Sequence, residues 1–405
     1  MFKEKLLKGY LNDVCIVGGL GHVGLPLGIS FAKAGKKVVL YDINQKSVDL
    51  VSRCKMPFME LGAEEALKDV LGKRLFVTTE RKVISESYFI VVTIGTPIDE
   101  HLNPEFILFM DFFSGILGLL KDDQHIIIRS TVFPGTTGKI TEFLRSKGKK
   151  TKVSFCPERI AQGRAIEEIR SLPQIIASSD KEALNEVKEL FSCLTDMIVP
   201  LEPEEAELAK LFTNVWRYFQ FAISNQFYQI AAQNGFDFYK IYEAVTYEYP
   251  RIKGFTRAGF AAGPCLFKDT MQLAAYSNNQ FFLGHAAMLI NEGLPNFIVQ
   301  KLKEKYDLKK KVVGILGMAF KGDIDDCRES LSYKLKKTLE IEAKQVLCSD
   351  PFVRDDRLVA LDRLIIDSDI IILGAPHTVY KGLKIDYSSK VVVDVWNFFG
   401  RGGIF

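Results

Sequence analysis

One thiol, set in a loop of small residues, is the strongest chemical signal in this sequence. Residues 259–269 read Gly-Phe-Ala-Ala-Gly-Pro-Cys-Leu-Phe-Lys-Asp. Gly259 and Gly263 carry no side chain, so the backbone at both positions can approach a ligand closely. The lysine that follows is a cation, and a cation near a cysteine favours the nucleophilic thiolate. Cys265 is therefore a candidate nucleophile, and the alternative is a buried cysteine packed in a Gly/Ala turn.

A glycine-rich turn near the start of the chain predicts a nucleotide-binding site. An apolar run over residues 13–18 leads into Gly-Leu-Gly-His-Val-Gly at 19–24, a helical pattern continues to Ala34, and a second apolar run ends in an acid. This order is the dinucleotide fingerprint in its structural context, unless the glycines form a turn without a ligand. The acid would hold ribose hydroxyls and repel a 2′-phosphate, so NAD is favoured over NADP. The cofactor-binding candidates are Gly19, Gly21, Val23, Gly24 and Asp42.

Three further apolar runs, which we expect to be strands, end in polar residues. The runs cover residues 88–94, 125–129 and 153–155. Ligands of parallel sheets bind outside the carboxyl ends of the strands, so these ends predict one shared site. Capping or turn formation is the alternative for Thr131 and Glu158. The candidate site residues at these ends are Gly95, Thr96, Thr131, Glu158 and Arg159.

A long helix is predicted over residues 204–234, with acids at its start and Asn-Gly at its end. At 1.5 Å per residue it would span on the order of 45 Å, enough to join two domains and pair with a second copy. Lys210 and Asn214 are four residues apart and project from one face. Apolar residues flank both, although a lone lysine on a helix is most often solvated.

The second half of the chain returns to an α/β pattern. A helical region is predicted at about 270–306, and a strand over 312–318 starts the new alternation. This strand is not followed by a complete glycine fingerprint, so we do not expect this domain to bind its own dinucleotide. The predicted fold class is α/β, with two doubly wound Rossmann-like domains joined by a long central helix.

The composition is typical of a soluble globular protein of two or three domains. The 405 residues are 47% hydrophobic and 25% charged, with a net charge of +3, which is too small to indicate a nucleic-acid or membrane partner. The seven cysteines form no CxxC pair, which argues against a disulfide framework or a zinc site. The apolar runs are strand-sized and no signal-peptide pattern is present, so a cytoplasmic location is expected.

These motifs, in this order, resemble the nucleotide-sugar 6-dehydrogenases of the UDP-glucose/GDP-mannose dehydrogenase family. The resemblance covers nearly the whole chain. It runs from the glycine fingerprint through the strand ends, the helix pair and the cysteine loop to Phe320-Lys321 and Arg328-Glu329-Ser330. It implies an NAD-binding Rossmann domain at 1–203, a central helical dimerisation domain with the cysteine at 204–308, and a nucleotide-sugar-binding α/β domain at 309–405.

The family oxidises the C6 alcohol of a nucleotide sugar to a carboxylate in two NAD-linked steps, for polysaccharide biosynthesis. The resemblance implies that Cys265 attacks the C6 aldehyde and that the second oxidation converts the thiohemiacetal to a thioester. Lys210 and Asn214 would stabilise the developing oxyanion. The remaining catalytic roles are those of Glu158, as the base for thioester hydrolysis, and of Thr131 and Asp269, which would position water or the reacting hydroxyl.

The resemblance also implies contacts with both ligands and a homodimer formed through the central helix. Besides the fingerprint residues, the implied NAD contacts are Lys46, Gly95, Thr96, Thr131, Lys268 and Arg328. The implied UDP-sugar contacts are Glu158, Arg159, Lys210, Asn214, Gly259, Phe260, Lys321 and, from a second subunit, Arg251. No metal is implied.

Four positions depart from the family pattern, and none removes a core catalytic group. Pro264 stands where Ser or His is common, which bears on the sugar pocket. Gln162 replaces a second glutamate found in many UDP-glucose enzymes, and Leu61 replaces the proline of a Glu-Pro-Gly turn. The basic residue that often follows the ribose-binding acid is displaced to Lys46.

The sugar is predicted from short motifs that point in two directions. Cys-Pro-Glu-Arg159 and Tyr-Pro-Arg251 resemble enzymes that act on UDP-N-acetylhexosamines, whereas Cys-Leu-x-Lys-Asp resembles those that act on UDP-glucose. The hexosamine class is slightly favoured, and UDP-glucose is the alternative. Two other function classes stay open: a two-electron hydroxyacid dehydrogenase, which would not need Cys265, and a non-catalytic nucleotide-sugar-binding protein.

Overall fold

The computed structural model describes residues 9–99 and 105–401, and its chain divides into two compact units, Met1–Thr213 and Asn214–Phe405. The long helix α8 (Pro203–Gln233) passes through the boundary, and each of its ends lies one residue from the predicted end. Gly235, just beyond it, has a φ of 72°, the left-handed conformation that commonly ends a helix.

The first unit is built on an eight-stranded sheet of order β3-β2-β1-β4-β5-β6-β7-β8. Its first six strands are parallel and have the strand order of the dinucleotide-binding fold. The last two strands run in the opposite direction, because β6 and β7 pair antiparallel. The strands are β1 (Asn12–Val17), β2 (Val38–Tyr41), β3 (Leu75–Thr78), β4 (Ser87–Val92), β5 (His125–Ile128), β6 (Lys152–Phe155), β7 (Gln174–Ala177) and β8 (Ile198–Leu201).

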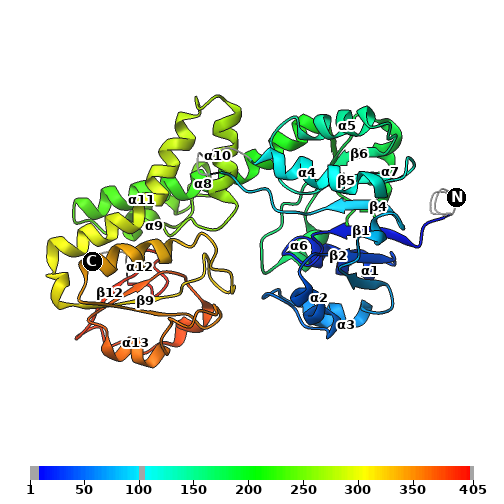
Figure 1. The fold of residues 1–405 in the computed structure, drawn as a ribbon. Helices are drawn as coiled ribbons and strands as arrows, with labels where there is room; N and C mark the ends of the chain where they lie inside the picture. The colour runs from blue at the N-terminus through cyan, green and yellow to red at the C-terminus, as the bar shows by residue number, and fades with distance from the viewer. Residues whose placement is uncertain (1–8, 100–104, 402–405) are drawn as a thin grey trace. The chain divides into compact units, whose positions relative to one another are not determined.

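Helices cover both faces of this sheet (Figure 1) because successive strand residues point to opposite sides. Val14 and Ile16 lie in one core with residues of α1, α3, α6 and α7, whereas Cys15 and Val17 lie in the other with residues of α4 and α5. The helices are α1 (Gly24–Lys33), α2 (Gln45–Ser52), α3 (Ala63–Val70), α4 (Phe106–Ile116), α5 (Thr136–Ser146), α6 (Ala165–Ser171) and α7 (Lys181–Phe191).

The second unit contains a parallel four-stranded sheet of order β10-β9-β11-β12. Residues of α8, α11 and α12 pack on one face and α13 on the other, so this sheet is also doubly wound, and the predicted fold class is confirmed. The elements are β9 (Val312–Leu316), α12 (Leu331–Glu342), β10 (Gln345–Ser349), α13 (Leu361–Asp367), β11 (Ile370–Leu373) and β12 (Val391–Val393).

The helical region expected at 270–306 consists of two helices, α10 (Leu266–Tyr276) and α11 (Phe282–Lys305). Asn278 and Asn279 separate them with φ angles of 51° and 58°. Asparagine adopts this left-handed conformation more readily than most residues, because its short side chain can hydrogen-bond locally. The remaining helix, α9 (Phe238–Thr246), follows α8 directly.

Candidate active site

The glycine turn between β1 and α1 has the shape that a dinucleotide requires. A Cβ on Gly19 would lie 2.7 Å from the Ile16 carbonyl oxygen, and one on Gly24 would lie 2.8 Å from the Gly18 carbonyl oxygen. A Cβ on Gly21, in contrast, would come no closer than 3.6 Å to other atoms, because this position faces open space. At the start of α1, the Leu25 amide donates to the Gly21 carbonyl oxygen at 3.1 Å, and Pro26 has no amide hydrogen. A pyrophosphate would therefore meet the open backbone of the glycine turn and the positive end of the α1 dipole, and the turn fits NAD.

Asp42 follows β2 and closes the other side of this turn. Its Oδ2 accepts a hydrogen bond from the Leu20 amide at 3.1 Å, and its Oδ1 accepts one from the Asn44 amide at 3.0 Å. The side chain is partly exposed and can accept further hydrogen bonds from a ribose. Lys46 is exposed on the first turn of α2.

His22, within the glycine turn, is half-buried. Its ring centroid lies 4.0 Å from that of Phe58, and its Nε2 lies 3.3 Å from Nε2 of Gln162. Both partners come from distant parts of the chain, so the sequence around His22 does not specify this packing. Gln162, the residue that departs from the family pattern, therefore contacts the glycine turn.

The strand ends after β4 and β5 are joined directly. The Thr96 hydroxyl donates to the Thr131 carbonyl oxygen at 2.6 Å, and the Ser130 hydroxyl donates to the Ile94 carbonyl oxygen at 2.6 Å. Thr131 is half-buried, and Gly95 is exposed beside it. The predicted residues Gly95, Thr96 and Thr131 are thus neighbours at one edge of the sheet.

Glu158 and Lys210 form an ion pair in the first unit, with 3.2 Å between Oε1 and Nζ. The lysine side chain is only 4% exposed and the glutamate side chain 15%, so this lysine is not the solvated residue that a lone helix lysine usually is. The second carboxylate oxygen of Glu158 accepts from the Ile160 amide at 2.8 Å. Such a pair, largely removed from water, is held in a defined geometry.

The turn that presents Glu158 is held by a buried cation. Arg129 donates to the Cys156 carbonyl oxygen and to Oε1 of Gln174, both at 3.0 Å. Burial lowers the pKa of Arg129, while the negative charge of Glu158 acts in the other direction. The adjacent Arg159 donates to the carbonyl oxygen of Pro173, an interaction within the protein.

The start of α8 is fixed to the first unit by Glu207, which is fully buried. Its carboxylate accepts hydrogen bonds from the Gly135 amide at 2.6 Å and the Thr137 amide at 2.8 Å. These amides open α5, where a carboxylate also interacts favourably with the helix dipole. The register of α8, and with it the position of Lys210, follows from this contact.

In the second unit, Cys265 is exposed and is the N-cap residue of α10. The positive end of a helix dipole favours an anion at this position. The loop before it requires glycine at two places. Gly263 has a φ of 102°, and a Cβ there would lie 2.7 Å from the ring of Phe320. A Cβ on Gly259 would lie 2.3 Å from the ring of Trp396.

Asp269 lies one turn after Cys265 and is fully buried. The Asn214 side-chain amide donates to its Oδ2 at 2.5 Å. Its Oδ1 lies 3.3 Å from Lys268 Nζ, an ion pair without hydrogen-bond geometry. Asp269 is therefore in direct contact with Asn214 and with Lys268, two other predicted site residues.

Arg328 lies in the loop between β9 and α12. Its guanidinium forms two-point hydrogen bonds with the carboxylate of Asp326, the shorter of them 2.6 Å long. The Asp326 carboxylate raises the pKa of Arg328, and the charge of Cys265 acts in the same direction, which places the two side chains in one electrostatic environment.

The other substrate candidates of this unit lie in different surroundings. Lys321 is half-buried in the loop after β9, and Arg251 is exposed in the short helix η3 (Pro250–Ile252). Phe260 is 4% exposed and packs in the core beside β9 and α11. Any ligand contact of Phe260 therefore involves its backbone.

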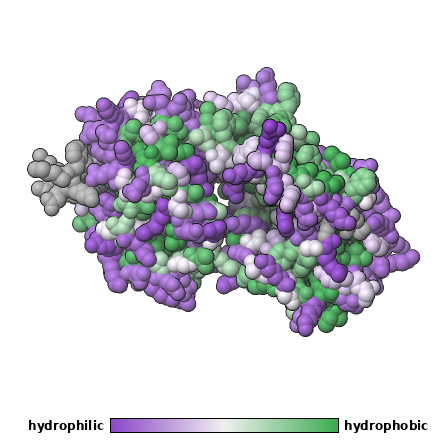
Figure 2. All heavy atoms as spheres, turned by 180° about the vertical axis from the view of Figure 1, so that it is seen from behind, coloured by the Kyte–Doolittle hydropathy of each residue, from purple (hydrophilic) through white to green (hydrophobic). Residues whose placement is uncertain are grey.

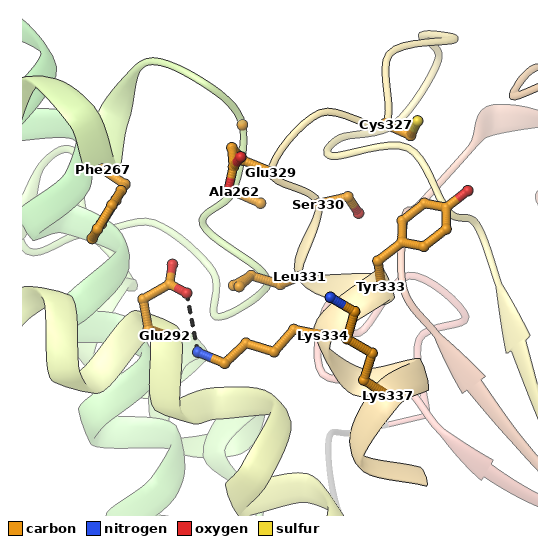
Figure 3. Close-up of a pocket in the computed structure, with 11 residues that line it drawn as sticks. Ala262, Phe267, Glu292, Cys327, Glu329, Ser330, Leu331, Tyr333, Lys334 and Lys337 are labelled. Atoms are coloured by element: carbon orange, nitrogen blue, oxygen red, sulfur yellow. Dashed lines mark hydrogen bonds and ion pairs between the residues drawn. The ribbon is translucent and has the colours of Figure 1, made fainter. Parts of the chain in front are cut away.

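A pocket of about 350 Å³ adjoins the cysteine loop. Figure 3 shows Glu292 of α11 and Lys334 of α12 facing one another across it, and their charged atoms are 3.1 Å apart. Ala262 and Gly263 contribute one wall, but Cys265 does not line the pocket. We therefore do not assign the reaction to it.

The loop after β9 is fastened by a buried pair, Asp350 and His377, whose side chains are fully buried. Nδ1 of His377 accepts a hydrogen bond from the Asp323 amide at 2.9 Å, so the ring proton is on Nε2, which donates to Asp350 at 3.0 Å. Asp350 also accepts from the amides of Met318 and Ala319, at 2.6 and 3.0 Å. The loop that carries Lys321 and Arg328 is thereby tied to β10 and β11.

Replacing Asp350 with asparagine is expected to destabilise the second unit. Burial alone would raise the pKa of Asp350, but hydrogen bonds from His377 and from backbone amides outweigh it and lower the pKa to about 2. Relative to the ordinary value of 3.8, this shift corresponds to about 2.5 kcal/mol, present above pH 4 and lost as the pH falls toward 2. The test is the melting temperature at pH 7 and at pH 3.5.

Tryptophan fluorescence reports on this unit, because both tryptophans, Trp216 and Trp396, lie in it. At pH 7 we expect Asp350→Asn to melt roughly 5–10 °C below the parent protein, and the gap to narrow at pH 3.5. Asp356→Asn, an exposed control in the same unit, should change little. Equal losses at both pH values would contradict the assignment of this stability to the Asp350 charge.

Models of three domains of one family match the chain in order. They are the NAD binding domain of the UDP-glucose/GDP-mannose dehydrogenase family at residues 12–195, the central domain at 204–292 and the UDP binding domain at 314–401. The chain belongs to the UDP-glucose/GDP-mannose dehydrogenase family. It is accordingly an oxidoreductase, an NAD-dependent nucleotide-sugar dehydrogenase with a UDP binding domain.

Individual members of the family are similar to this chain over nearly their whole length. A UDP-N-acetyl-D-mannosamine dehydrogenase of Methanocaldococcus jannaschii is 29% identical, with 97% of this chain and 94% of the relative covered. The structure of a UDP-D-ManNAc dehydrogenase from Pyrococcus horikoshii matches with a TM-score of 0.87, at 27% identity over 95% of this chain and 96% of the other. The structure of a UDP-glucose dehydrogenase from Pyrobaculum islandicum matches with a TM-score of 0.85, at 26% identity over 95% and 94%.

Two general properties of the described residues complete the site. No helix within residues 9–99 and 105–401 is long and apolar enough to cross a membrane. In the same part of the chain, no group of three or more His, Cys, Asp and Glu side chains could hold a metal ion. Figure 2 shows apolar side chains in patches on a surface that is otherwise largely hydrophilic.

Sequence reasoning missed the buried residues that support the site, chiefly Arg129, Asn225 and Asn291. One signal was available for Asn225. It follows Asn214 by eleven residues, which is about three helical turns, so both side chains project from the same face of α8. A second buried amide on the face that carries Asn214 indicates that this face forms specific hydrogen bonds.

Proposed function

We propose that this protein oxidises the C6 hydroxyl of a UDP-sugar to a uronic acid in two NAD-linked steps, with Cys265 holding the intermediate. The observation that carries the proposal is an exposed thiol at the start of α10, beside the buried Asn214–Asp269 pair. The chain combines this thiol with the family's NAD and UDP binding domains. A two-electron dehydrogenase would not require such a thiol.

The proposed reaction uses the thiol to avoid releasing an aldehyde. NAD, when bound, accepts the hydride in each oxidation. After the first, the sulfur of Cys265 adds to the C6 aldehyde, and the second oxidation converts the thiohemiacetal to a thioester. Water then breaks the C–S bond, which leaves the carboxylate and returns the thiol. Each sugar therefore produces two NADH and consumes one water.

The other side chains that we propose for catalysis have roles that follow from their chemistry. The ammonium of Lys210 and the amide of Asn214 are hydrogen-bond donors, and such donors stabilise the oxyanion that forms at C6. Glu158, paired with Lys210 at 3.2 Å, accepts the proton of the attacking water. Asp269 orients Asn214, and Thr131 positions the reacting hydroxyl.

We also assign residues to the binding of each ligand, NAD and the UDP-sugar. We propose that the glycine turn, Lys46, the Gly95–Thr96 strand end, Lys268 and Arg328 bind NAD. Asp42 at the end of β2 would exclude NADP by repelling its 2′-phosphate. For the UDP-sugar, we propose Arg159, Gly259, the Phe260 backbone and Lys321, with Arg251 from a second subunit.

For the sugar itself we propose a UDP-N-acetylhexosamine. The motifs around Arg159 and Arg251 support this class, and so do relatives named UDP-N-acetyl-D-mannosamine dehydrogenase at 25–29% identity. UDP-glucose is the second candidate. It is favoured by the Cys-Leu-x-Lys-Asp sequence and by the structural match to a UDP-glucose dehydrogenase.

The test is the number of NADH molecules formed per sugar consumed. Purified protein would be assayed with NAD and with NADP against UDP-N-acetylmannosamine, the other UDP-N-acetylhexosamines, UDP-glucose and GDP-mannose. We expect two NADH per sugar with one UDP-N-acetylhexosamine and little turnover with NADP. Two NADH from UDP-glucose alone would favour the second candidate. One NADH per sugar would reject the thioester chemistry, and no turnover on any sugar would favour a binding protein.

We also propose that the protein is a homodimer formed through α8. Trp216, Ile223, Phe227 and Ile230 are each between 44% and 61% exposed, and helical spacing places them on one stripe about 60° wide. Asn214 and Asn225 lie on the opposite face of the helix. A stripe of large apolar side chains along an exposed helix is typical of a helix that pairs with another.

Adding a charge to this stripe is expected to separate the subunits. A Trp216→Lys, Phe227→Lys variant should have half the mass of the parent protein by light scattering, because two desolvated lysines oppose pairing. Lys240→Ala, which changes an exposed residue of α9, is the control. A parent protein with the mass of one chain at micromolar concentration would reject the dimer.

A further inference from the structure

Two fully buried asparagines form a hydrogen-bonded chain beneath the loop that carries Cys265. They are Asn225 of α8 and Asn291 of α11. Oδ1 of Asn225 accepts from the Gly259 amide at 2.8 Å, and Nδ2 of Asn225 donates to the Gly259 carbonyl oxygen at 3.0 Å. Asn225 therefore binds both backbone groups of one residue, as a paired strand would.

The second asparagine fixes the orientation of the first. Nδ2 of Asn225 also donates to Oδ1 of Asn291 at 2.9 Å, and Nδ2 of Asn291 donates to the Tyr218 carbonyl oxygen at 3.1 Å. The Gly259 amide can only donate and the Tyr218 carbonyl can only accept. Rotating either side-chain amide by half a turn would place donor against donor or acceptor against acceptor, so the chain has one stable direction.

The same helix holds the loop at earlier positions. Gln220 donates to the Gly254 carbonyl oxygen at 2.8 Å, and Ser224 donates to the Thr256 carbonyl oxygen at 2.6 Å. The loop has no regular secondary structure, and these carbonyl groups find partners on α8 instead. Asn225 is the last of these contacts before the thiol and the only one of the three that binds an amide and a carbonyl together.

Beyond Gly259, close packing transmits this constraint toward the thiol. Gly259 lies against the Trp396 ring and Gly263 against the Phe320 ring, each without room for a Cβ. The Gly263 amide also donates to the Glu329 carbonyl oxygen at 3.3 Å. A segment held at both glycines leaves little freedom to Cys265, two residues after Gly263.

We propose that Asn225, supported by Asn291, is a positioning residue that sets the place of the Cys265 thiol. It does not touch the reacting atoms and acts through the backbone of Gly259. That this placement serves catalysis rests on the function proposed above. Displacing a reacting group by about 1 Å can lower a rate on the order of 100-fold. Loss of the hydrogen bonds between Asn225 and Gly259 should therefore affect the chemical step more than substrate binding.

The test compares Asn225→Asp and Asn291→Asp with Asn234→Ala. Asn225→Asp keeps the size of the side chain and the oxygen that accepts from the Gly259 amide. Its second carboxylate oxygen, however, replaces the nitrogen that donates to the Gly259 carbonyl oxygen and to Oδ1 of Asn291. Asn291→Asp keeps the acceptor for Asn225 and loses only the donation to Tyr218. Asn234 lies just beyond the end of the same helix and bonds to Ile230 there, so its change is the control.

In both aspartate variants we expect hydrogen exchange of the amides in residues 255–265 to accelerate at least about tenfold. With the sugar that the panel identifies, kcat should fall roughly 10- to 100-fold for Asn225→Asp and less for Asn291→Asp, while KM changes by less than about threefold. Alkylation of Cys265 by iodoacetamide, followed on its peptide by mass spectrometry, should change its rate in Asn225→Asp and not in Asn234→Ala.

Three outcomes would overturn the proposal. One is a folded Asn225→Asp variant with unchanged exchange in 255–265 and unchanged kcat. Another is a fall in melting temperature and activity without faster exchange in this loop, which is what a merely structural role predicts. The third needs no variant: rapid exchange of the Gly259 amide in the parent protein. Exchange is measured without substrate, so a parent protein that oxidises no sugar would reject the proposed function and leave this test intact.

Discussion

Replacing Cys265 with alanine is expected to lower the rate of uronic acid formation at least about 10³-fold, because the variant has no nucleophile to capture the aldehyde. The first oxidation does not use the sulfur and should persist. The stoichiometry should therefore fall from two NADH per sugar toward one, and aldehyde should become detectable with a carbonyl reagent. Acid and NADH would be measured on the same samples.

The chain provides a matched control for this experiment. Cys193 is also exposed, and its thiol donates to the Leu190 carbonyl oxygen near the end of α7. Cys193→Ala should keep the activity of the parent protein within about twofold, since surface substitutions of this kind have small effects. Acid formation by Cys265→Ala at the parent rate would show that the thioester is not an intermediate.

The second large effect is expected at Lys210. Replacing it with methionine, which keeps most of the side-chain volume, should lower kcat on the order of 10²- to 10³-fold, the usual effect of losing one oxyanion donor. The change also leaves the Glu158 carboxylate without its partner in a place that is 15% exposed. A largely buried carboxylate without a partner is unfavourable, so the melting temperature of the variant would be measured beside kcat.

The measurement is kcat and KM at one pH for Lys210→Met, for the parent protein and for Lys188→Met. Lys188 is exposed on α7 and outside the proposed site, so its replacement should leave both constants unchanged. A Lys210→Met variant that is folded, binds the UDP-sugar and keeps kcat within a few-fold would contradict the oxyanion role. A rise in KM with an unchanged kcat would assign Lys210 to substrate binding instead.

Several features of this protein were determined by the sequence, because the signals that specify them are local. The glycine turn, its flanking strands and Asp42 all lie between residues 12 and 42, and only glycine avoids the contacts at Gly19 and Gly24. The ends of α8 follow from the acids at its start and the Asn-Gly at its end. The periodicity of the apolar residues was enough to predict that the chain contains two doubly wound sheets.

The tertiary structure alone decided which polar side chains meet and which are buried. Lys210 pairs with Glu158 from 52 residues away, Asn214 with Asp269 from 55, and Asn225 with Gly259 from 34. A helix lysine with a distant carboxylate has the same local sequence as a solvated one, so burial could not be predicted. The physical reason is that strand order and helix packing bring these partners together, and a buried polar group remains stable only where its partner meets it.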